Sequence, residues 1–417
     1  MRTGYEKMLD AVMELSIVDS HEHIFQDEKE DMELDIFKTY LQHYFSVDLI
    51  SAGMTWQEMN VVQNPAIPVI DRWNIAEKHW DNARLTGYGQ SLDLAVKALY
   101  GEDRIDRNTI ESLSKKFTEA NKPGHYAHVL RDMCQIEFSV NDMIDEMRML
   151  KSPLFKFVAR VDQFVEPTCR LDFERISGLT GVRIRTLLDY EEACEKFLDI
   201  VLSDGHIGLK CGLAYRRPLL FEKVARHRAE ETFNLISQQE HGGGADVRAF
   251  QDYMMRFICR GADKRGMFMQ VHTGILEGNA NHIPNSDPTQ LSALIRENPN
   301  LRFDLFHIGY PYHEQLGAMV KMYPNAYADF AWAHIISPPV ARRMLSDWIE
   351  TMPSDKIVGF GGDYCFVDGV YGHQLIARRN VAKVLADKVE DGLMDFNRAK
   401  KIAKMILNEN GKRVFLT

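Results

Sequence analysis

The chain has 417 residues, of which 45% are hydrophobic, and its formal net charge is −10. This length suits one large α/β domain or two smaller ones with a sizeable buried core. The acidic balance and the absence of Lys/Arg runs argue against a nucleic-acid surface, and no apolar run approaches membrane-spanning length.

The amino terminus and the cysteines bear on the cellular setting. Residues 1–16 have the pattern of an amphipathic helix and lack the apolar centre of a signal peptide. The six cysteines are scattered without a CxxC pair, which argues against a disulfide framework. We therefore expect a cytoplasmic homo-oligomer that acts on a small molecule and has no nucleic-acid or membrane partner.

The stretch Ile17–Phe25, IVDSHEHIF, begins as a buried strand and ends in polar residues. Because side chains alternate along a strand, His21 and His23 point the same way from its carboxyl end, and Glu22 faces away. Two imidazoles on one face are what a divalent metal such as zinc requires from a single element. The alternative is a strand end that happens to be rich in histidine.

Helical patterns dominate residues 26–133, where apolar residues recur at spacings of three and four. We predict that this segment is a helical insertion between the first and second strands, and a possible lid. Residues 1–25 and 134–417 then form the main domain.

From residue 134 onward, apolar strands alternate with amphipathic helices such as Tyr190–Gly205. The helical stretch Phe221–Arg260 is interrupted by a predicted loop at residues 241–244. The predicted strands after the first are Ile136–Asp142, Phe155–Val165, Ile207–Tyr215, Gly266–Ile275, Leu301–Tyr310, Ala326–His334 and Lys356–Tyr364. Eight strands, most of them near-continuously apolar, predict a (β/α)₈ TIM barrel. The alternative is a doubly wound sheet, but its glycine-rich phosphate-binding turn is missing from the sequence.

Potential metal ligands and catalytic groups fall near the carboxyl ends of these strands, where barrels of this class place their chemistry. In chain order they are His21, His23, Lys210, His272, His307 and Asp363. A single strand histidine is most often a core group with satisfied hydrogen bonds. Four histidines and an aspartate at one rim are hard to explain by packing, so they indicate an active site.

This set resembles the pattern of the amidohydrolase superfamily of metal-dependent barrels, with HxH on strand one, Lys on strand four, His on strands five and six, and Asp on strand eight. The resemblance runs from Asp19 to Asp363 and is most specific in VDSHEH, MQVHTG, LFHIGYP and GFGGDY. LKCGLAYRRPL, QVHTG and YPNAYADFAWA resemble the amidohydrolase-like region of glutamine-synthetase-related fusion proteins. The helical insertion and the tail GHQLIARRNVAKVLADKVEDG resemble uronate isomerases.

Two departures from the uronate isomerase pattern favour hydrolysis over isomerisation. Uronate isomerases typically place an arginine two residues after the strand-eight aspartate, where this chain has Cys365. They also generally lack a histidine at the position of His307.

The resemblance implies that His21, His23, His272 and Asp363 hold one divalent cation, for which we expect zinc. Such an ion lowers the pKa of a bound water from about 16 toward about 7. Asp363 would accept the proton of that water and pass it to the leaving group. His307 would polarise the substrate carbonyl.

A two-metal site is the alternative, and it depends on Lys210. A protonated ammonium cannot ligate a cation, so Lys210 would have to be carboxylated to bridge two ions. His272 and His307 would then bind the second ion. We favour one ion because other cations lie close to Lys210 in the sequence.

Residues near the ends of the fourth and seventh strands suggest how substrate is bound. Arg216 and Arg217 could bind a carboxylate, or they could form ordinary salt bridges in a surface turn. Tyr215 and Trp332 could line a pocket or simply pack at the rim. For His43, in the insertion, we expect a position on a helix surface rather than over the barrel mouth.

These observations predict a metal-dependent hydrolase that acts on a small, carboxylate-bearing amide, lactone or ester. A uronate isomerase, which uses the metal site for proton transfer between adjacent carbons, is the first alternative. A decarboxylase on the same scaffold is the second. The last is a barrel that has lost its chemistry and serves as a binding module.

Overall fold

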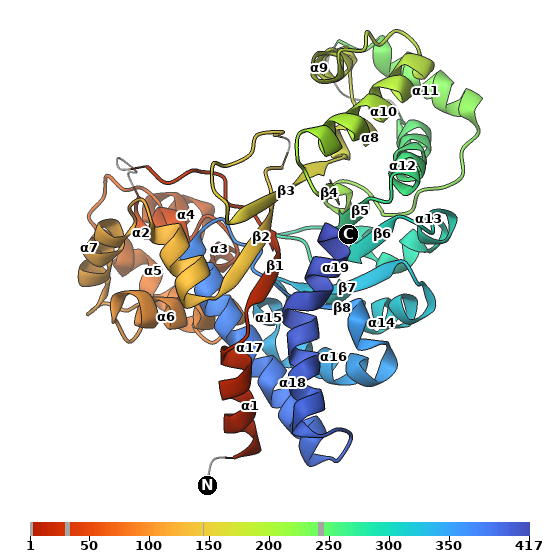
Figure 1. The fold of residues 1–417 in the computed structure, drawn as a ribbon. Helices are drawn as coiled ribbons and strands as arrows, with labels where there is room; N and C mark the ends of the chain where they lie inside the picture. Colours follow the sequence, from red (N-terminus) through yellow and green to blue (C-terminus); the bar gives the residue numbers. More distant parts are fainter. Residues whose placement is uncertain (1–2, 30–33, 145, 241–245) are drawn as a thin grey trace.

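Eight parallel strands form the centre of the computed structural model, which describes residues 3–29, 34–144, 146–240 and 246–417 (Figure 1). Each strand pairs in parallel with the next one along the chain. The strands are β1 (Ile17–Glu22), β2 (Ile136–Asp142), β3 (Phe155–Arg160), β4 (Gly208–Cys211), β5 (Phe268–Val271), β6 (Arg302–Leu305), β7 (Ala326–Ala331) and β8 (Ile357–Gly361). The predicted (β/α)₈ barrel is therefore confirmed.

The first and last strands approach each other at their carboxyl ends. The N–H of Asp363, just after β8, donates to the carbonyl of His21 in β1 over 2.7 Å. Gly362 permits this approach, because a Cβ there would lie 1.9 Å from Oε1 of Glu22. This contact between β1 and the residues after β8 brings Asp363 beside the two histidines of the HEH sequence.

Several strands are shorter than the sequence predicts. The predicted strand Phe155–Val165 ends at Arg160, and its last residues form the short helix α8 (Asp162–Val165). The predicted strand Ile207–Tyr215 ends at Cys211 and continues as a 3₁₀ turn. Most residues of these extensions are apolar and buried, and a short apolar run does not distinguish a buried helical turn from a strand. The loop predicted at residues 241–244 lies outside the described residues.

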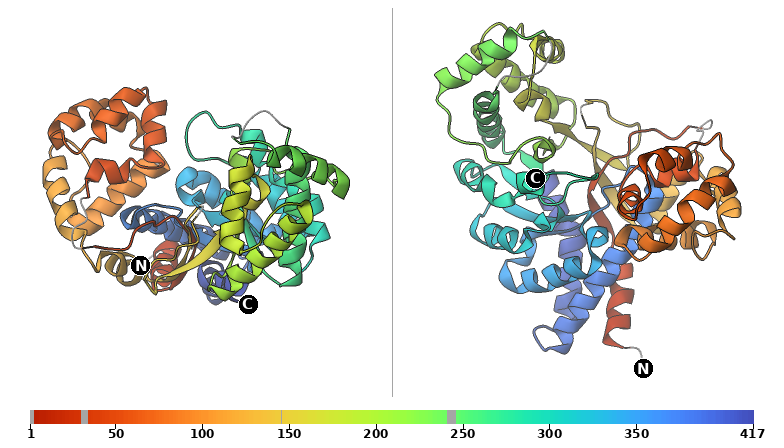
Figure 2. Two further views of the ribbon diagram at one scale, coloured as in Figure 1. Left: turned by 90° about the horizontal axis from the view of Figure 1, so that it is seen from above. Right: turned by 180° about the vertical axis from the view of Figure 1, so that it is seen from behind.

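Helices surround the barrel and extend from it on two sides (Figure 2). Outside the segment between β1 and β2 they are α1 (Gly4–Met13), α8, α9 (Arg170–Thr180), α10 (Leu187–Ser203), α11 (Arg226–Ser237), α12 (Arg248–Lys264), α13 (Ser292–Glu297), α14 (His313–Met322), α15 (Ala333–Ile336), α16 (Pro338–Thr351), α17 (Val367–Glu390), α18 (Phe396–Lys404) and α19 (Asn410–Leu416). Their buried residues are largely apolar, and most of them share one core cluster with residues of the strands.

The chain between β1 and β2 is helical and lies to one side of the barrel (Figure 1). It contains α2 (Ile36–Tyr40), α3 (Phe45–Ser51), α4 (Trp56–Val62), α5 (Val69–Ala83), α6 (Gly87–Tyr100), α7 (Ile110–Ala120) and a π-helix at Ala127–Met133. Helix α6 packs closely on α17, where a Cβ at Gly372 would lie 1.9 Å from the carbonyl oxygen of Ser91. These helices are called the insertion below.

A buried carboxylate at the start of α17 ties the insertion to the barrel. Asp368 accepts hydrogen bonds from the hydroxyls of Tyr40 and Tyr100, at 2.7 and 2.6 Å. Nε2 of His125 lies 2.8 Å from its other oxygen. All three partners belong to the segment between β1 and β2, so one side chain of the barrel organises the base of the insertion.

We expect Asp368→Asn to lower the free energy of unfolding by about 3 kcal/mol, because it removes the charge that three buried donors share. Urea denaturation measures this loss. Asp391→Asn, an exposed position at the other end of α17, is the matched control and should change stability little. Equal stability of the two variants would show that the Asp368 contacts contribute nothing.

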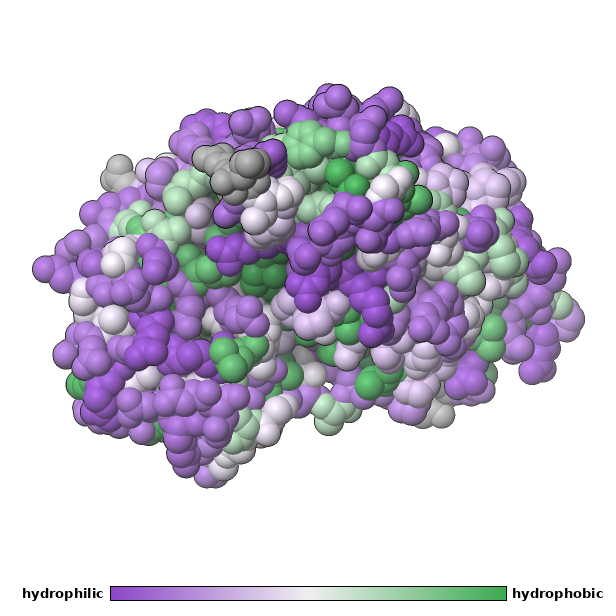
Figure 3. All heavy atoms as spheres, turned by 90° about the horizontal axis from the view of Figure 1, so that it is seen from below, coloured by the Kyte–Doolittle hydropathy of each residue, from purple (hydrophilic) through white to green (hydrophobic). Residues whose placement is uncertain are grey.

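The surface drawn in Figure 3 is mainly hydrophilic, with apolar residues in small groups. Scattered apolar residues are usual on folded proteins and mark no site by themselves. Within the described part of the chain, none of the helices has the length and apolar character needed to cross a bilayer.

Candidate metal centre

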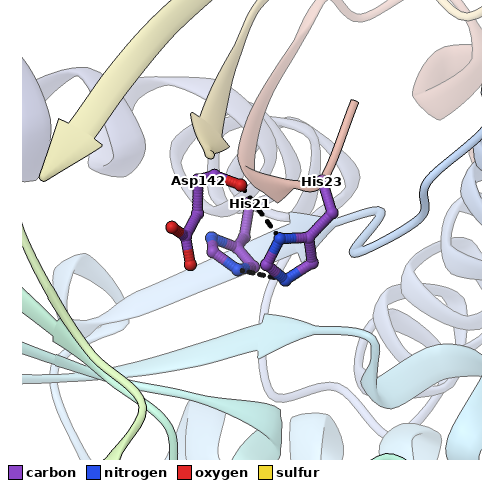
Figure 4. A group of neighbouring side chains, drawn as sticks. All are labelled: His21, His23 and Asp142. Carbon is purple, nitrogen blue, oxygen red and sulfur yellow. Dashed lines mark hydrogen bonds between the residues drawn. The ribbon is translucent and has the colours of Figure 1, made fainter. Parts of the chain in front are cut away.

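The two histidines of the HEH sequence lie side by side at the carboxyl end of β1 (Figure 4). Their Nε2 atoms are 3.3 Å apart. Nδ1 of His23 lies 3.0 Å from the backbone oxygen of Asp142 and can donate to it, which leaves Nε2 free as a ligand. Burial lowers the pKa of His23 to about 3 and that of His21 well below its usual value. Both rings are therefore neutral, the form that binds a metal.

A second pair of imidazoles comes from the loops that follow β5 and β6. Nε2 of His307 lies 3.2 Å from Nδ1 of His272. The outer nitrogen of each ring faces a carbonyl oxygen at 2.8 Å, that of Ala331 for His307 and that of Ile275 for His272. Such backbone acceptors orient the ring and turn the other nitrogen inward. Burial lowers the pKa of both histidines.

Asp363 faces three of these rings. Its Oδ1 lies 3.3 Å from Nε2 of His23 and 3.7 Å from Nε2 of His21, and its Oδ2 lies 3.6 Å from Nε2 of His307. Burial raises the pKa of Asp363 to about 7, although Lys210 opposes this shift. The carboxylate thus joins histidines from two distant parts of the barrel.

Lys210 points from β4 toward the same centre. Its Nζ lies 3.1 Å from Nε2 of His21 and 3.7 Å from the centroid of the Phe306 ring. Burial lowers the pKa of this lysine to about 8, because the ammonium is held away from water. The structure therefore places all six predicted residues at one rim of the barrel.

Asp142, at the end of β2, is a second carboxylate beside His21 and His23, and it is not among the site residues predicted from the sequence. The three ligand atoms lie within 4.8 Å of one another, a spacing that a metal ion could bridge. Arg160 already pairs with this carboxylate at 2.9 Å. Burial acts to raise the pKa of Asp142, but Arg160 and other cations outweigh it and the net shift is downward. We therefore favour Asp363 as the carboxylate of the centre. In the sequence, the polar residues that end the strand Ile136–Asp142 were the feature that could have indicated Asp142.

Several residues at this centre have strained backbone conformations with positive φ. His307, Trp332 and Asp363 have φ values of 62°, 62° and 59°, in the region that non-glycine residues rarely adopt. Tyr44, from the insertion, has φ of 50°, and its hydroxyl donates to the backbone carbonyl of Asp363. Strained residues of this kind cluster at functional sites, where the surrounding fold holds them in place. No sequence pattern singled out Tyr44, which lies more than three hundred positions from its partner.

The donor set fits a divalent cation. The Nε2 atoms of His21, His23 and His307 face the Asp363 carboxylate, and backbone carbonyls orient the outer nitrogens of His23 and His307. Nitrogen and oxygen donors of this kind suit zinc and neighbouring transition metals better than the all-oxygen cages of calcium or magnesium.

Two of the residues proposed for substrate binding border the centre. The Tyr215 ring packs against His272 with centroids 4.8 Å apart, and Tyr215 is partly exposed. The Trp332 ring stands perpendicular to His307 at 5.2 Å and stacks on Tyr44 at 4.6 Å. Both aromatic side chains therefore form walls beside the imidazoles.

The two arginines are engaged elsewhere. Arg216 is half exposed and pairs with Glu166. Arg217 donates to Asp252, to Gln251 and to the backbone carbonyls of Pro218 and Leu220. These contacts favour the salt-bridge alternative that the sequence left open for both residues.

The expectation for His43 was wrong. It lies in the turn between α2 and α3 rather than on a helix, and its Nδ1 is 2.9 Å from Sγ of Cys365, two residues beyond Asp363. An apolar spacing that continues through a turn explains the misassignment, because periodicity alone does not mark where one helix stops and the next begins.

The fold and the side chains at its rim define the class of protein: a (β/α)₈ barrel with a candidate His/Asp metal centre at the carboxyl ends of its strands. A family model described as Amidohydrolase matches residues 218–415, which contain β5 to β8 with His272, His307 and Asp363. This match covers slightly less than half of the chain, and it agrees with the resemblance of the strand-end motifs to the metal-dependent amidohydrolase superfamily.

Solved structures share the fold over almost the whole chain. A uronate isomerase from Thermotoga maritima is 15% identical, covers 99% of this chain and 97% of its own, and has a TM-score of 0.80. A glucuronate isomerase from Caulobacter crescentus is 18% identical, covers 99% of this chain and 93% of its own, and has a TM-score of 0.77. A Lactobacillus casei protein provisionally described as a metal-dependent hydrolase is 17% identical, covers 98% of this chain and 97% of its own, and has a TM-score of 0.66. At these identities the likeness establishes the fold.

A curated fungal protein is similar over a shorter region. Protein fluG from Emericella nidulans is 28% identical over 148 residues, which are 35% of this chain. The matched segment amounts to 17% of that protein's length.

Proposed function

We propose that the protein is a metal-dependent hydrolase of a small, carboxylate-bearing amide, lactone or ester. The observation that carries the proposal is the position of Asp363, whose two oxygens face His21 and His23 on one side and His307 on the other. Hydrolysis needs a proton acceptor beside a polarising group, and this arrangement supplies both from one rim.

His21, His23, His272 and Asp363 are the residues that would hold the cation, with zinc the ion we favour. When bound there, a divalent ion makes a coordinated water more acidic and polarises a carbonyl oxygen. The neutral state of the imidazoles, which burial enforces, suits them to this role.

The remaining chemistry falls to protein groups. Asp363 would take up the proton of the attacking water and return it to the leaving nitrogen or oxygen. The Nδ1–H of His307 donates to the carbonyl of Ala331, so His307 would need a second proton, on Nε2, to polarise the substrate carbonyl. Trp332 and Tyr215 would shield these groups from bulk water.

Lys210 decides between one ion and two. Its Nζ lies 3.1 Å from Nε2 of His21, so a carboxylated Lys210 would lie close enough to bind the same ion as that histidine. We favour the single-ion form, in which the free amine stays beside the Phe306 ring as a positive charge near the substrate.

We expect His307→Asn to lower kcat by about 10²–10³-fold while the protein keeps its full metal content. Asparagine is chosen because it tolerates the positive φ of this position. Metal analysis and steady-state kinetics are the measurements, with His313→Asn on α14 as the control. Loss of about one metal equivalent in His307→Asn would instead identify a two-ion site.

Uronate isomerisation is the second candidate, because two of the solved structures that share the whole fold are uronate or glucuronate isomerases. In that case Asp363 and the hydroxyl of Tyr44 would lie where a proton moves between adjacent carbons. Cys365 and His307, the two departures in the sequence, favour hydrolysis.

One experiment separates the candidates. The purified protein is loaded with zinc or manganese, its metal content is measured, and it is incubated in parallel with glucuronate, galacturonate and a panel of carboxylate-bearing amides, lactones and esters. Release of acid from the panel supports the hydrolase. Ketose formation from the uronates with no hydrolysis contradicts it, and failure to bind any metal contradicts both candidates.

A further inference from the structure

A recess of about 220 Å³ opens between the insertion and the loop that follows β5. Its walls are Val47 and Tyr88 of the insertion, residues 275–281 and Ile283 of the loop, and Trp332. The recess borders the candidate centre at two points. The Trp332 ring contacts the His307 ring, and the carbonyl of Ile275 faces Nε2 of His272.

The lining of the recess is mostly apolar, and its amide groups are turned toward the protein. Nδ2 of Asn281 donates to the carbonyls of Glu277 and Gly278, at 2.7 and 3.0 Å. Nδ2 of Asn279 donates across the recess to the carbonyl of Val47, at 3.3 Å. These donors hold the loop in shape, and the remaining polar side chains of the lining are those of Glu277 and Tyr88.

The size and polarity of the recess limit what can occupy it. An apolar cavity of about 150 Å³ accepts a benzene molecule, so 220 Å³ suits one ring with a small substituent. A polyhydroxylated chain placed there would recover few of the hydrogen bonds that it makes to water, which is costly. An aromatic or saturated hydrocarbon ring would gain by leaving water.

We propose that this recess is a subsite for a ring-sized apolar or aromatic group of the substrate, joined to the bond that reacts at the candidate centre. The assignment rests on the proposed function for the location of that bond. It narrows the substrate class to acids, amides or esters with a hydrocarbon ring, and it excludes sugar acids as the preferred ligand.

Isothermal titration of the metal-loaded protein with benzoate, acetate and glucuronate tests the subsite without requiring turnover. We expect benzoate to bind at least tenfold more tightly than acetate or glucuronate, since a ring-sized group fills the recess. Ile283→Asn, at the rim with 43% of the residue exposed, should weaken benzoate binding about tenfold and leave acetate binding unchanged. Leu393→Asn, a comparably exposed position outside the recess, is the control.

Tighter binding of glucuronate than of benzoate would overturn the subsite, as would an Ile283→Asn variant that binds benzoate normally. Failure of the proposed function has a different signature. In that case benzoate binding would respond to Ile283→Asn as expected, but no amide, lactone or ester of the panel would be cleaved.

Discussion

Asp363→Asn is expected to lower kcat by about 10²–10⁴-fold, because an amide cannot accept the proton that this carboxylate is proposed to carry. Asparagine keeps nearly the same volume and tolerates the φ of 59° at this position, so the backbone should be preserved. The measurement is kcat at saturating zinc, with bound metal determined on the same samples. Retained turnover would contradict the role given to Asp363.

Asp142→Asn is the matched control for this variant. Asp142 is also buried beside His21 and His23, but its charge is already shared with Arg160. We expect a smaller loss of kcat than in Asp363→Asn. The reverse order would identify Asp142 as the acting carboxylate, with Asp363 in a supporting position.

Removal of the cation by a chelator should reduce activity by more than about 10³-fold, and zinc should restore it, because the activated water depends on the ion. His23→Ala should prevent this recovery, since the variant lacks one of the imidazoles of the HEH pair. His23 lies just beyond β1, outside the paired strand, so its replacement should be tolerated by the fold.

Metal content measured before and after reconstitution checks this prediction. His313→Ala, a partly exposed histidine of α14, serves as the control and should bind and recover metal like the unmodified protein. Full metal content and activity in His23→Ala would place the ion elsewhere.

The sequence alone predicted the barrel and the rim at which polar residues gather. Both depend on local rules. Apolar runs separated by amphipathic helices indicate parallel strands buried on both faces, and the carboxyl ends of such strands share one edge. Alternation along a strand likewise placed His21 and His23 on one face before any distance was known.

Strand ends were less predictable, for a physical reason that Phe155–Val165 illustrates. Val161, Phe164 and Val165 are fully buried apolar residues like those of the strand, but residues 162–165 form the helix α8. Burial sets the composition of a segment, whereas its backbone conformation depends on hydrogen bonds to neighbours that the local sequence does not reveal.

The tertiary structure decided which distant groups meet. Tyr44 reaches Asp363 and Asp368 gathers Tyr40, Tyr100 and His125 only because the insertion folds back against the start of α17. Neither contact follows from spacing or periodicity, since the partners lie more than two hundred residues apart.

Tertiary contacts also decided which cations and aromatic residues lie beside the centre. Arg216 and Arg217 stand beside Lys210 in the sequence, but ion pairs with Glu166 and Asp252 direct them elsewhere. Trp332 lies against His307 because β6 and β7 are neighbours in the sheet. Residue type and strand period thus determined which chemistry this chain carries and at which rim, whereas packing between remote segments decided which side chains face the centre, because long-range contacts depend on the whole fold.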